Sequence, residues 1–199
     1  MGVRLSLTDN RKEALEAAIP QIVRPIQLPG QLIHQPVEKF GALDGAANLA
    51  GVVHKTIGIS GITQLTNEEW SFVTGINLTG VFYATRAQLQ AMEKLGCGGS
   101  IVNAASTAGI EGLTRSAAKE VGRRGVRVNA IAPGVIDTYM VQTLPKAMNG
   151  GVDWLVQHQQ ALGRRAQPLE IAKLIAFLLS DESSFTTGAI YVADRRQVC

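Results

Sequence analysis

The sequence predicts an α/β fold built around a parallel sheet. Two short apolar runs, 100–103 and 127–132, are each followed closely by polar or turn residues, Ser106 after the first and Pro133-Gly134 after the second. Buried parallel strands have this pattern because both of their faces are covered. A helical stretch between the two runs completes a strand, helix and strand unit. Because open α/β sheets bind ligands just beyond the carboxyl ends of their strands, Ser106 and the Pro-Gly turn are the first candidates for a site.

Length and composition indicate one domain over residues 1–199, since a chain of this size can bury a core of its own. The net charge is only +3, and the arginine clusters contain no interleaved aromatic residues, so we expect no nucleic-acid partner. Cys97 and Cys199 have no neighbours at metal-ligand spacing, so we expect no metal site. Neither a signal peptide nor a membrane-spanning run is evident, which favours a cytoplasmic protein without a membrane partner.

The first residues read as a strand followed by a helix. Residues 2–8 are rich in Val and Leu and stop at Asp9, after which Asn10-x-x-Glu13 resembles a capping box. Asp9 has two readings. It can accept a hydrogen bond from the ribose 2′-hydroxyl of a dinucleotide, which favours NAD over its 2′-phosphorylated form, or it can cap the helix. These residues alone leave both readings open.

The middle of the chain predicts a short strand over 43–51 that turns at Asn48-Leu-Ala-Gly51, and then a long helix. The turn is either a place where a flat ligand approaches the backbone or a plain tight turn. Thr66-x-x-Glu69 is a capping box, and the helix that it opens runs to the stop at Gly96. The residues on its expected inner face are Trp70, Val73, Ile76, Asn77, Val81, Phe82, Thr85, Leu89 and Met92.

Asn77 is the polar amide on that face, and a buried amide is costly unless it is paired. It is therefore either a hydrogen-bonded core residue or part of a site. Further along, residues 139–165 have the composition of a mobile flap over a substrate. Pro168 then marks the start of a helix, and residues 189–193 form a final strand.

Five motifs occur in order along nearly the whole chain. They are Asn48-Leu-Ala-Gly51, Asn77-Leu-Thr-Gly80, Gly99-Ser-Ile-Val-Asn103 with Ser106-x-x-Gly109, Arg127-Val-Asn-Ala-Ile-Ala-Pro-Gly134 and Thr187-Gly-x-x-x-Val192. Together they resemble the short-chain dehydrogenase/reductase family. The resemblance implies a doubly wound parallel sheet in a Rossmann-like, three-layer α/β/α arrangement. It also implies NAD(P) binding and hydride transfer between the nicotinamide and a small alcohol or ketone.

The resemblance also assigns roles to matching positions. Ser106 resembles the serine that binds the substrate oxygen, and Asn77 resembles the asparagine that holds a proton-relay water. By the same resemblance Asp9 gains weight as the ribose-binding acid, which favours NAD. The turn beside the adenosine half is matched by Asn48, Ala50 and Gly51. The loop around the nicotinamide amide is matched by Pro133, Gly134, Val135 and Thr138.

Several departures accompany these matches. The glycine-rich loop of the family should precede Val3, and without it this chain has no pyrophosphate cradle, which argues against NAD(P) binding by the chain as it stands. The first strand of the family is missing with that loop, and the region of the third strand is shortened to 20–36. We expect the chain to have doubtful stability alone, because a central strand contributes several buried side chains.

The most consequential departure lies between Gly112 and Leu113, where the family carries Tyr-x-x-x-Lys. The helix after Ser106 is shortened by this loss. Arg115-Ser-Ala-Ala-Lys119 imitates the spacing, but an arginine stays protonated and cannot shuttle a proton. Because positioned proton transfer contributes about 10²–10⁴-fold, we expect the chain to be nearly inert as a dehydrogenase.

The departures are more typical of missing exons or a faulty gene model, with segments lost, than of gradual drift, since family-like sequence resumes after each one. Two functions follow. The first is an NAD(P)-dependent oxidoreductase represented by an incomplete chain. The alternative is a non-catalytic member that acts by binding, or as a homo-oligomer formed through the helix over 66–96 or through the last strand.

Overall fold

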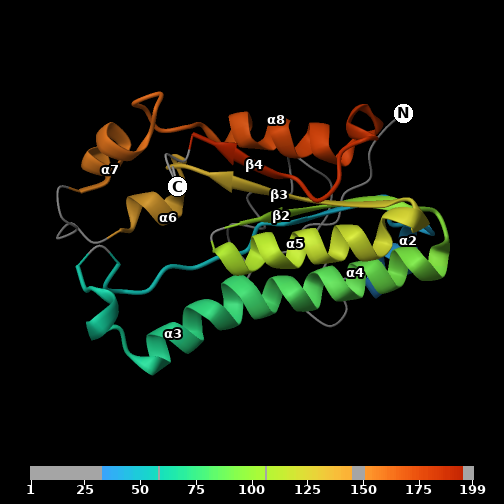
Figure 1. The fold of residues 1–199 in the computed structure, drawn as a ribbon, viewed down its shortest axis with the longest axis horizontal. Helices are drawn as coiled ribbons and strands as arrows, with labels where there is room; N and C mark the ends of the chain where they lie inside the picture. The colour runs from blue at the N-terminus through green and yellow to red at the C-terminus, as the bar shows by residue number, and fades with distance from the viewer. Residues whose placement is uncertain (1–32, 58, 106, 145–150, 195–199) are drawn as a thin grey trace.

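The computed structural model describes residues 33–57, 59–105, 107–144 and 151–194, so the expected strand over 2–8, Asp9 and Ser106 lie outside the described residues. The described sheet consists of β1 (Gly45–Asn48), β2 (Gly99–Ala104), β3 (Val126–Pro133) and β4 (Ile190–Ala193). The strands lie in the order β1-β2-β3-β4, and each neighbouring pair is parallel. This arrangement confirms the predicted α/β fold with a parallel sheet (Figure 1).

Helices cover both faces of the sheet. On β2, Ile101 packs in a cluster with residues of α4 (Val81–Leu95) and α5 (Ala108–Val121), whereas Val102 packs with residues of α8 (Pro168–Leu179). Successive side chains of a strand point to opposite faces, so α8 lies on the face opposite to α4 and α5. The same three layers are visible in Figure 1, with α8 on one side of the strands and α4 and α5 on the other. They confirm the predicted three-layer α/β/α arrangement.

The last connection differs from the one before it. The strand order continues in one direction from β2 through β3 to β4, yet α5 and α8 cover opposite faces. The connection from β3 to β4 therefore has the opposite handedness to the β2-α5-β3 connection. Parallel crossovers are almost always right-handed, so a reversal is rare. In the described part of this connection, α6 (Tyr139–Gln142) and α7 (Gly151–Gln159) lie at the carboxyl edge of the sheet before α8 returns across it.

The helix boundaries follow local signals. Helix α2 (His34–Phe40) ends at Gly41, whose φ of 72° is one that glycine adopts readily. Thr66 forms the expected capping box with Glu69 at the start of α3 (Asn67–Thr74). This helix continues through a π-helical segment, Gly75–Gly80, into α4. The predicted long helix from Thr66 to Gly96 is thus confirmed, with a π segment at Asn77.

The inner face of that helix is more polar than the sequence suggested. Thr85 and Gln88 are buried on α4, while Trp70 is 61% exposed and Phe82 is 40% exposed. The prediction that both aromatic side chains face inward is therefore wrong. The polar side chains are tolerated because they are paired: Gln88 and Asn48 exchange two hydrogen bonds of 2.8 and 3.0 Å.

The expected flap over 139–165 is more regular than predicted. It contains α6 (Tyr139–Gln142) and α7 (Gly151–Gln159), which lie beyond the arrowheads of the strands in Figure 1. The composition of this segment suggested a loop because glycines and a proline interrupt it. None of the helices in the described part of the chain is long and apolar enough to cross a membrane.

Candidate functional site

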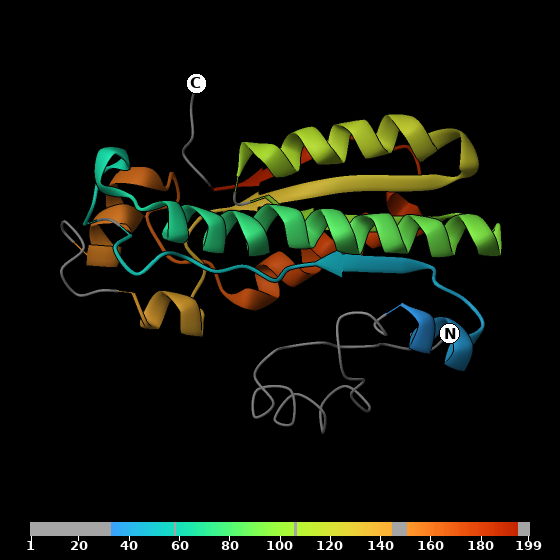
Figure 2. The same cartoon turned by 90° about the horizontal axis from the view of Figure 1, so that it is seen from below.

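The candidate site is the carboxyl edge of the sheet. All four strands point to the same end, so the segment after β1, the residues after β2, the turn after β3 and Asp194 after β4 share one edge (Figure 2). Of the predicted site residues, those from Asn48 to Gly51 and from Pro133 to Thr138 therefore lie at this edge. Ser106 and Asp9 lie outside the described residues.

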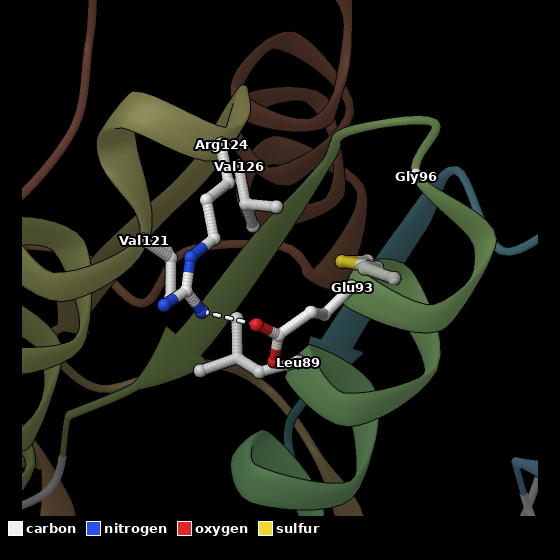
Figure 3. A pocket seen from close by; sticks show the side chains of 7 residues that line it. Leu89, Glu93, Gly96, Val121, Arg124 and Val126 are labelled. Atoms are coloured by element: carbon white, nitrogen blue, oxygen red, sulfur yellow. Dashed lines mark ion pairs between the residues drawn. The ribbon is translucent and has the colours of Figure 1, made fainter.

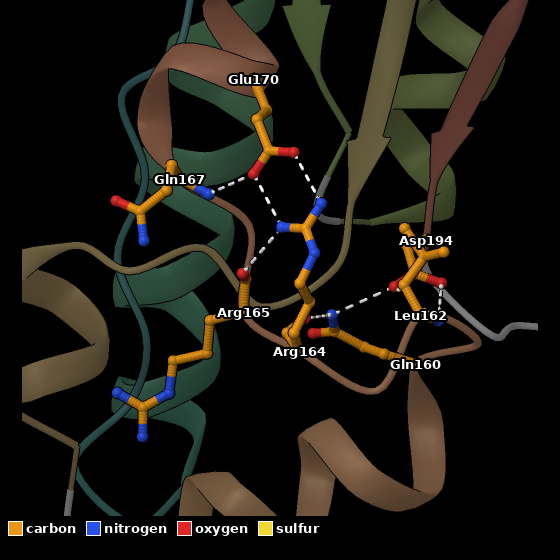
Figure 4. Close-up of polar contacts among 7 residues, drawn as sticks. All are labelled: Gln160, Leu162, Arg164, Arg165, Gln167, Glu170 and Asp194. Carbon is orange, nitrogen blue, oxygen red and sulfur yellow. Dashed lines mark hydrogen bonds and ion pairs between the residues drawn. The ribbon is translucent and has the colours of Figure 1, made fainter.

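The turn after β3 is closely packed at Gly134. A Cβ atom at this position would lie 2.7 Å from the carbonyl oxygen of Asp194, so only glycine fits. Buried Gln160 fixes the next peptide, because its Oε1 accepts a 2.6 Å hydrogen bond from the Val135 N–H. Its Nε2 donates to the Arg164 carbonyl oxygen at 2.6 Å (Figure 4). One side-chain amide thereby joins the turn after β3 to the segment before α8.

Asp194 holds the same region from the end of β4. It has a positive φ of 57°, which is uncommon for a residue other than glycine. Its Oδ1 accepts a 2.7 Å hydrogen bond from the Ala161 N–H, and both carboxylate oxygens accept from the Leu162 N–H at 3.2 Å. Its Oδ2 also accepts from Gln160 at 3.3 Å. The strained conformation therefore aims a carboxylate at the backbone just after α7.

An ion pair joins the segment before α8 to the first turn of that helix. Arg164 donates two hydrogen bonds to the carboxylate of Glu170, at 2.8 and 2.7 Å. The Gln167 N–H donates to the same carboxylate at 2.8 Å. The bonds from Arg164, followed by the backbone bond from Gln167, lower the pKa of Glu170 to about 2. This pair is exposed, so it orients the segment more than it stabilises the fold.

In the predicted nicotinamide loop, some residues have free hydrogen-bonding groups and others do not. Both backbone groups of Val135 are engaged, because its carbonyl oxygen accepts from the Ala166 N–H at 3.0 Å and its N–H bonds Gln160. The Thr138 hydroxyl makes only a long bond of 3.4 Å to the carbonyl oxygen of Ile136. In the described part of the chain the Ile136 N–H has no partner. Ile136 and Thr138 are therefore the positions in this loop that can bind a ligand.

The segment after β1 is held by the helix that follows it. The amide of Asn77 accepts a 2.8 Å hydrogen bond from the Val52 N–H and donates one of 2.8 Å to the Val52 carbonyl oxygen. Asn77 is 6% exposed and belongs to the π-helical segment, a distortion that is frequent at functional sites. Its side chain is thus a hydrogen-bonded core amide, and its role with a proton-relay water stays a prediction.

Asn48 uses its side chain inside the protein. Besides its bonds with Gln88, its Nδ2 donates to Asn103 Oδ1 at 2.8 Å, and Asn103 in turn donates to Thr114 at 3.2 Å. The amide of Asn48 is therefore committed to this network. The backbone of the turn through Ala50 and Gly51 is what remains for a ligand, and its place beside an adenosine stays a prediction.

A second polar chain lies in the same segment. His54 Nδ1 is 3.0 Å from Thr56 Oγ1, and the Thr56 hydroxyl donates to Glu69 Oε1 at 3.0 Å. The pKa of Glu69 is lowered because its carboxylate accepts hydrogen bonds, first from the Thr66 backbone N–H and then from Thr56. A histidine at the carboxyl edge is thus linked to an ionised carboxylate on α3.

The residues after β2 include an unsatisfied hydroxyl. Thr107 lies at the start of α5, next to Ser106, and its Oγ1 is buried without a partner among the described residues. On α5, Arg115 is exposed and pairs with Glu111 at 3.7 Å, so it does not replace a proton donor. The three tyrosines of the chain are Tyr83, Tyr139 and Tyr191. None of them lies between Ser106 and Arg127.

A small pocket of about 150 Å³ lies at the opposite end of the sheet (Figure 3). It is lined by Leu89, Met92, Glu93, Gly96, Val121, Arg124 and Val126. Arg124 and Glu93 form a 2.6 Å ion pair across it. Because Val126 begins β3 and Gly96 precedes β2, this pocket lies at the amino edge and is separate from the candidate site. Among the described residues, no group of His, Cys, Asp and Glu side chains could hold a metal ion.

Sequence reasoning missed His54, Gln160 and Asp194. Each forms a hydrogen-bonded network with residues that are distant in the sequence, so the folded backbone decides whether the contacts form. Asp194 carried a weak signal, since it is an acidic residue directly after the last strand. Gln160 carried none, because a glutamine in a polar segment is ordinarily exposed.

The chain matches known proteins over most of its length. Residues 29–195 match the family model described as enoyl-(acyl carrier protein) reductase. The short-chain dehydrogenase/reductase aba4 of Botryotinia fuckeliana (strain B05.10) is 39% identical over 223 residues, which cover 94% of this chain and 84% of the relative. This span exceeds the 199 residues of the chain, so the relative contains residues within it that the chain lacks. That difference agrees with the predicted missing internal segments.

Other relatives point to the same family. The 3-alpha-(or 20-beta)-hydroxysteroid dehydrogenase of Mycobacterium tuberculosis (strain ATCC 25618 / H37Rv) is 33% identical, over 94% of this chain and 76% of the relative. The crystal structure of levodione reductase superposes with a TM-score of 0.85 at 31% identity, covering 97% of this chain and 87% of that one. The order of the strands, the layers of helices and these matches agree. The chain belongs to the short-chain dehydrogenase/reductase family.

Proposed function

We propose that the carboxyl edge of this chain binds a nicotinamide dinucleotide, and that its reaction is hydride transfer between the nicotinamide and a small alcohol or ketone. The observation that carries the proposal is the turn after β3. Here Gln160 and Asp194 hold the backbone, while the Ile136 N–H and the Thr138 hydroxyl are left for a ligand. The carboxamide of nicotinamide has an oxygen that accepts and an NH₂ group that donates, so it can pair with the Ile136 N–H as donor and the Thr138 hydroxyl as acceptor.

The residues present fit part of the cofactor. Ile136 and Thr138 would hold the nicotinamide amide, and the turn through Ala50 and Gly51 would lie beside the adenosine. The hydroxyl of Thr107, next to Ser106, is buried without a partner among the described residues, and this supports a ligand at the end of β2, because such a polar atom is costly. When bound, the nicotinamide supplies or accepts the hydride. Asp9 would bind the ribose hydroxyls, which favours NAD over NADP by charge.

A second function is favoured by one observation. None of the tyrosines in the sequence lies between Ser106 and Arg127, so the usual acid/base group of the family has no counterpart there. A chain that binds the cofactor and turns over slowly, or not at all, would act as a binding member of the family. The loss of positioned proton transfer accounts for a rate reduction of about 10²–10⁴-fold.

Fluorescence titration with NADH separates these functions. We expect a saturable enhancement of nicotinamide fluorescence, weaker with NADPH, and loss of the enhancement in Thr138→Val. Thr143→Val is the matched control, because the Thr143 hydroxyl bonds only the carbonyl oxygens of its own helix among the described residues. NADH oxidation with cyclohexanone then tests turnover. Binding without turnover would establish the non-catalytic function, and no binding of either nucleotide would reject the proposed site.

A further inference from the structure

The chain from His54 through Thr56 to Glu69 defines where the histidine proton lies. The Thr56 hydroxyl has one proton, and it donates that proton to Glu69 Oε1. The lowered pKa of Glu69 keeps its carboxylate ionised near neutral pH, so Glu69 can only accept. Thr56 Oγ1 must therefore accept its other hydrogen bond from His54 Nδ1. In the neutral ring the proton is on Nδ1, and Nε2 carries a lone pair.

Nε2 is the nitrogen that the protein leaves open. In the described part of the chain it has no hydrogen-bond partner, although His54 is a half-buried residue. A histidine with one nitrogen oriented by a hydroxyl and a carboxylate, and the other nitrogen free, has the arrangement of an oriented general base. Glu69 is the charged group that faces it through Thr56, and the neighbouring Lys55 is exposed.

The backbone that presents His54 is fixed from two sides. Asn77 forms hydrogen bonds with both the backbone N–H and the backbone carbonyl oxygen of Val52, two residues before the histidine. Glu69 binds Thr56 two residues after it, and its other oxygen accepts from the Thr66 N–H. Both anchors come from the continuous helix formed by α3, the π-helical segment and α4. Catalytic groups need such support, because a loosely held side chain loses its geometry.

We propose that His54 is a proton-transfer residue, whose Nε2 bonds an oxygen of a small alcohol or carbonyl ligand at the carboxyl edge. Thr56 and Glu69 are positioning residues that act through it. The step rests on the proposed function. In the direction of reduction, a bound reduced nicotinamide would supply the hydride to the carbonyl carbon, and His54 would give the proton of Nε2 in its imidazolium form to the carbonyl oxygen. The products are the alcohol, the oxidised nicotinamide and the neutral Nδ1–H ring.

The tautomer is the first test, and it needs no cofactor. Nitrogen-15 NMR of the full chain, with the His54 signal assigned by its loss in His54→Gln, should show a protonated Nδ1 and an unprotonated Nε2 in the neutral ring. Thr56→Ser keeps a hydroxyl and should preserve this tautomer. Thr56→Val removes the hydroxyl and should shift the ring toward the Nε2–H form. A predominant Nε2–H form in the unsubstituted protein, or no difference between the two variants, would overturn the proposal.

The second test separates this inference from the cofactor. Cyclohexanol is added without nucleotide, and the Nε2 resonance of His54 should move saturably while the signal of His158 on α7 stays unchanged. If NADH does not bind but the Nε2 resonance responds, the proposed function fails and the ligand site at His54 stands. An unchanged Nε2 resonance at saturating NADH and cyclohexanol would reject His54 even where NADH binds.

Turnover gives the third readout. Where the chain oxidises NADH with cyclohexanone, His54→Gln should lower kcat by about 10²-fold or more without a matching change in KM. Thr56→Val should lower kcat by a smaller factor, about 10-fold, and Thr56→Ser should restore most of it. A wild-type kcat in His54→Gln would contradict the assignment.

Discussion

The two halves of the carboxyl edge are built in different ways. After β1, the segment that contains Val52 and His54 is held by side chains of one helix, Asn77 and Glu69. After β3 and β4, the turn and the segment before α8 are held to each other by Gln160 and Asp194. The backbone of the first half is held by a neighbouring helix, whereas the segments of the second half are held by hydrogen bonds to each other.

The difference lies in what each half leaves open. In the β3 and β4 half, the buried amide of Gln160 and the carboxylate of Asp194 are used for internal hydrogen bonds, and the open groups belong to Ile136 and Thr138. In the β1 half the open group is a titratable ring nitrogen of His54. We infer that one half orients a ligand and that the other exchanges a proton with it.

Gln160→Leu should have the largest effect on this comparison. It removes a buried amide and leaves the Val135 N–H and the Arg164 carbonyl oxygen without their partner, at a cost of about 3 kcal/mol in the free energy of unfolding. Urea denaturation measures this loss. NADH binding should weaken as well, while the tautomer of His54 should stay the same. A changed tautomer would show that the two halves are not independent.

Gln160→Glu is the sharper variant, because it keeps the shape of the side chain. Near pH 8 the new carboxylate would face Asp194 Oδ2 and the Arg164 carbonyl oxygen, and it would repel both. That repulsion raises the pKa of the new carboxyl in the folded state, so the stabilising protonated form is present at low pH and is lost as the pH rises. The stability deficit should therefore be smaller at about pH 5 than at about pH 8. A deficit independent of pH would contradict this geometry.

Asn77→Leu tests the β1 half. It removes two hydrogen bonds to the Val52 peptide and should cost about 2 kcal/mol in the free energy of unfolding. The His54 signal should broaden or change its tautomer, because one of its two anchors is lost. Asn67→Leu on the exposed first turn of α3 is the matched control and should change neither property. An unaffected His54 in Asn77→Leu would mean that Glu69 alone holds the segment.

Local signals explain which parts of this edge could be predicted. The capping box at Thr66, the stop at Gly96 and the proline at the start of α8 each act within one turn of helix, so the sequence was sufficient. The strands β2 and β3 were also evident as apolar runs. Gln160 and His54 depend instead on partners brought near by the whole fold, and their residue types are common on surfaces.

The inner face of α4 was mispredicted for a related reason. A search for apolar residues at helical spacing selects Phe82, and it passes over Gln88. Gln88 is buried because Asn48, from a strand far away in the sequence, satisfies its amide. Buried polar networks of this kind have no local periodicity, so their positions emerge only with the pairing of strands and helices.

Glu170→Gln should have a smaller effect that depends on pH. The pKa of Glu170 is lowered to about 2, so its pairing stabilises the folded state above the ordinary pKa of 4.5 and is lost as the pH falls toward 2. The difference in Tm between the unsubstituted protein and the variant should be constant near neutral pH and should shrink below about pH 4. Thermal unfolding across this range checks it. A difference that grows at low pH would have the wrong sign.

Arg124→Ala should have the smallest effect, because it lies at the amino edge. It removes an exposed ion pair with Glu93, and such pairs contribute less than about 1 kcal/mol. NADH binding and the His54 tautomer should both be unchanged. The variant is thus the control for every substitution at the carboxyl edge, and a loss of NADH binding here would move the cofactor to the other end of the sheet.

Hydrogen exchange with and without NADH shows whether the nucleotide binds at the carboxyl edge. We expect NADH to slow exchange of the backbone amides in two segments, the turn over 134–138 and the segment over 49–54. Amides that line the pocket at the amino edge, over 121–126, should exchange at the same rate with and without the nucleotide. Protection confined to 121–126, or no protection at saturating NADH, would contradict a nicotinamide site at the carboxyl edge.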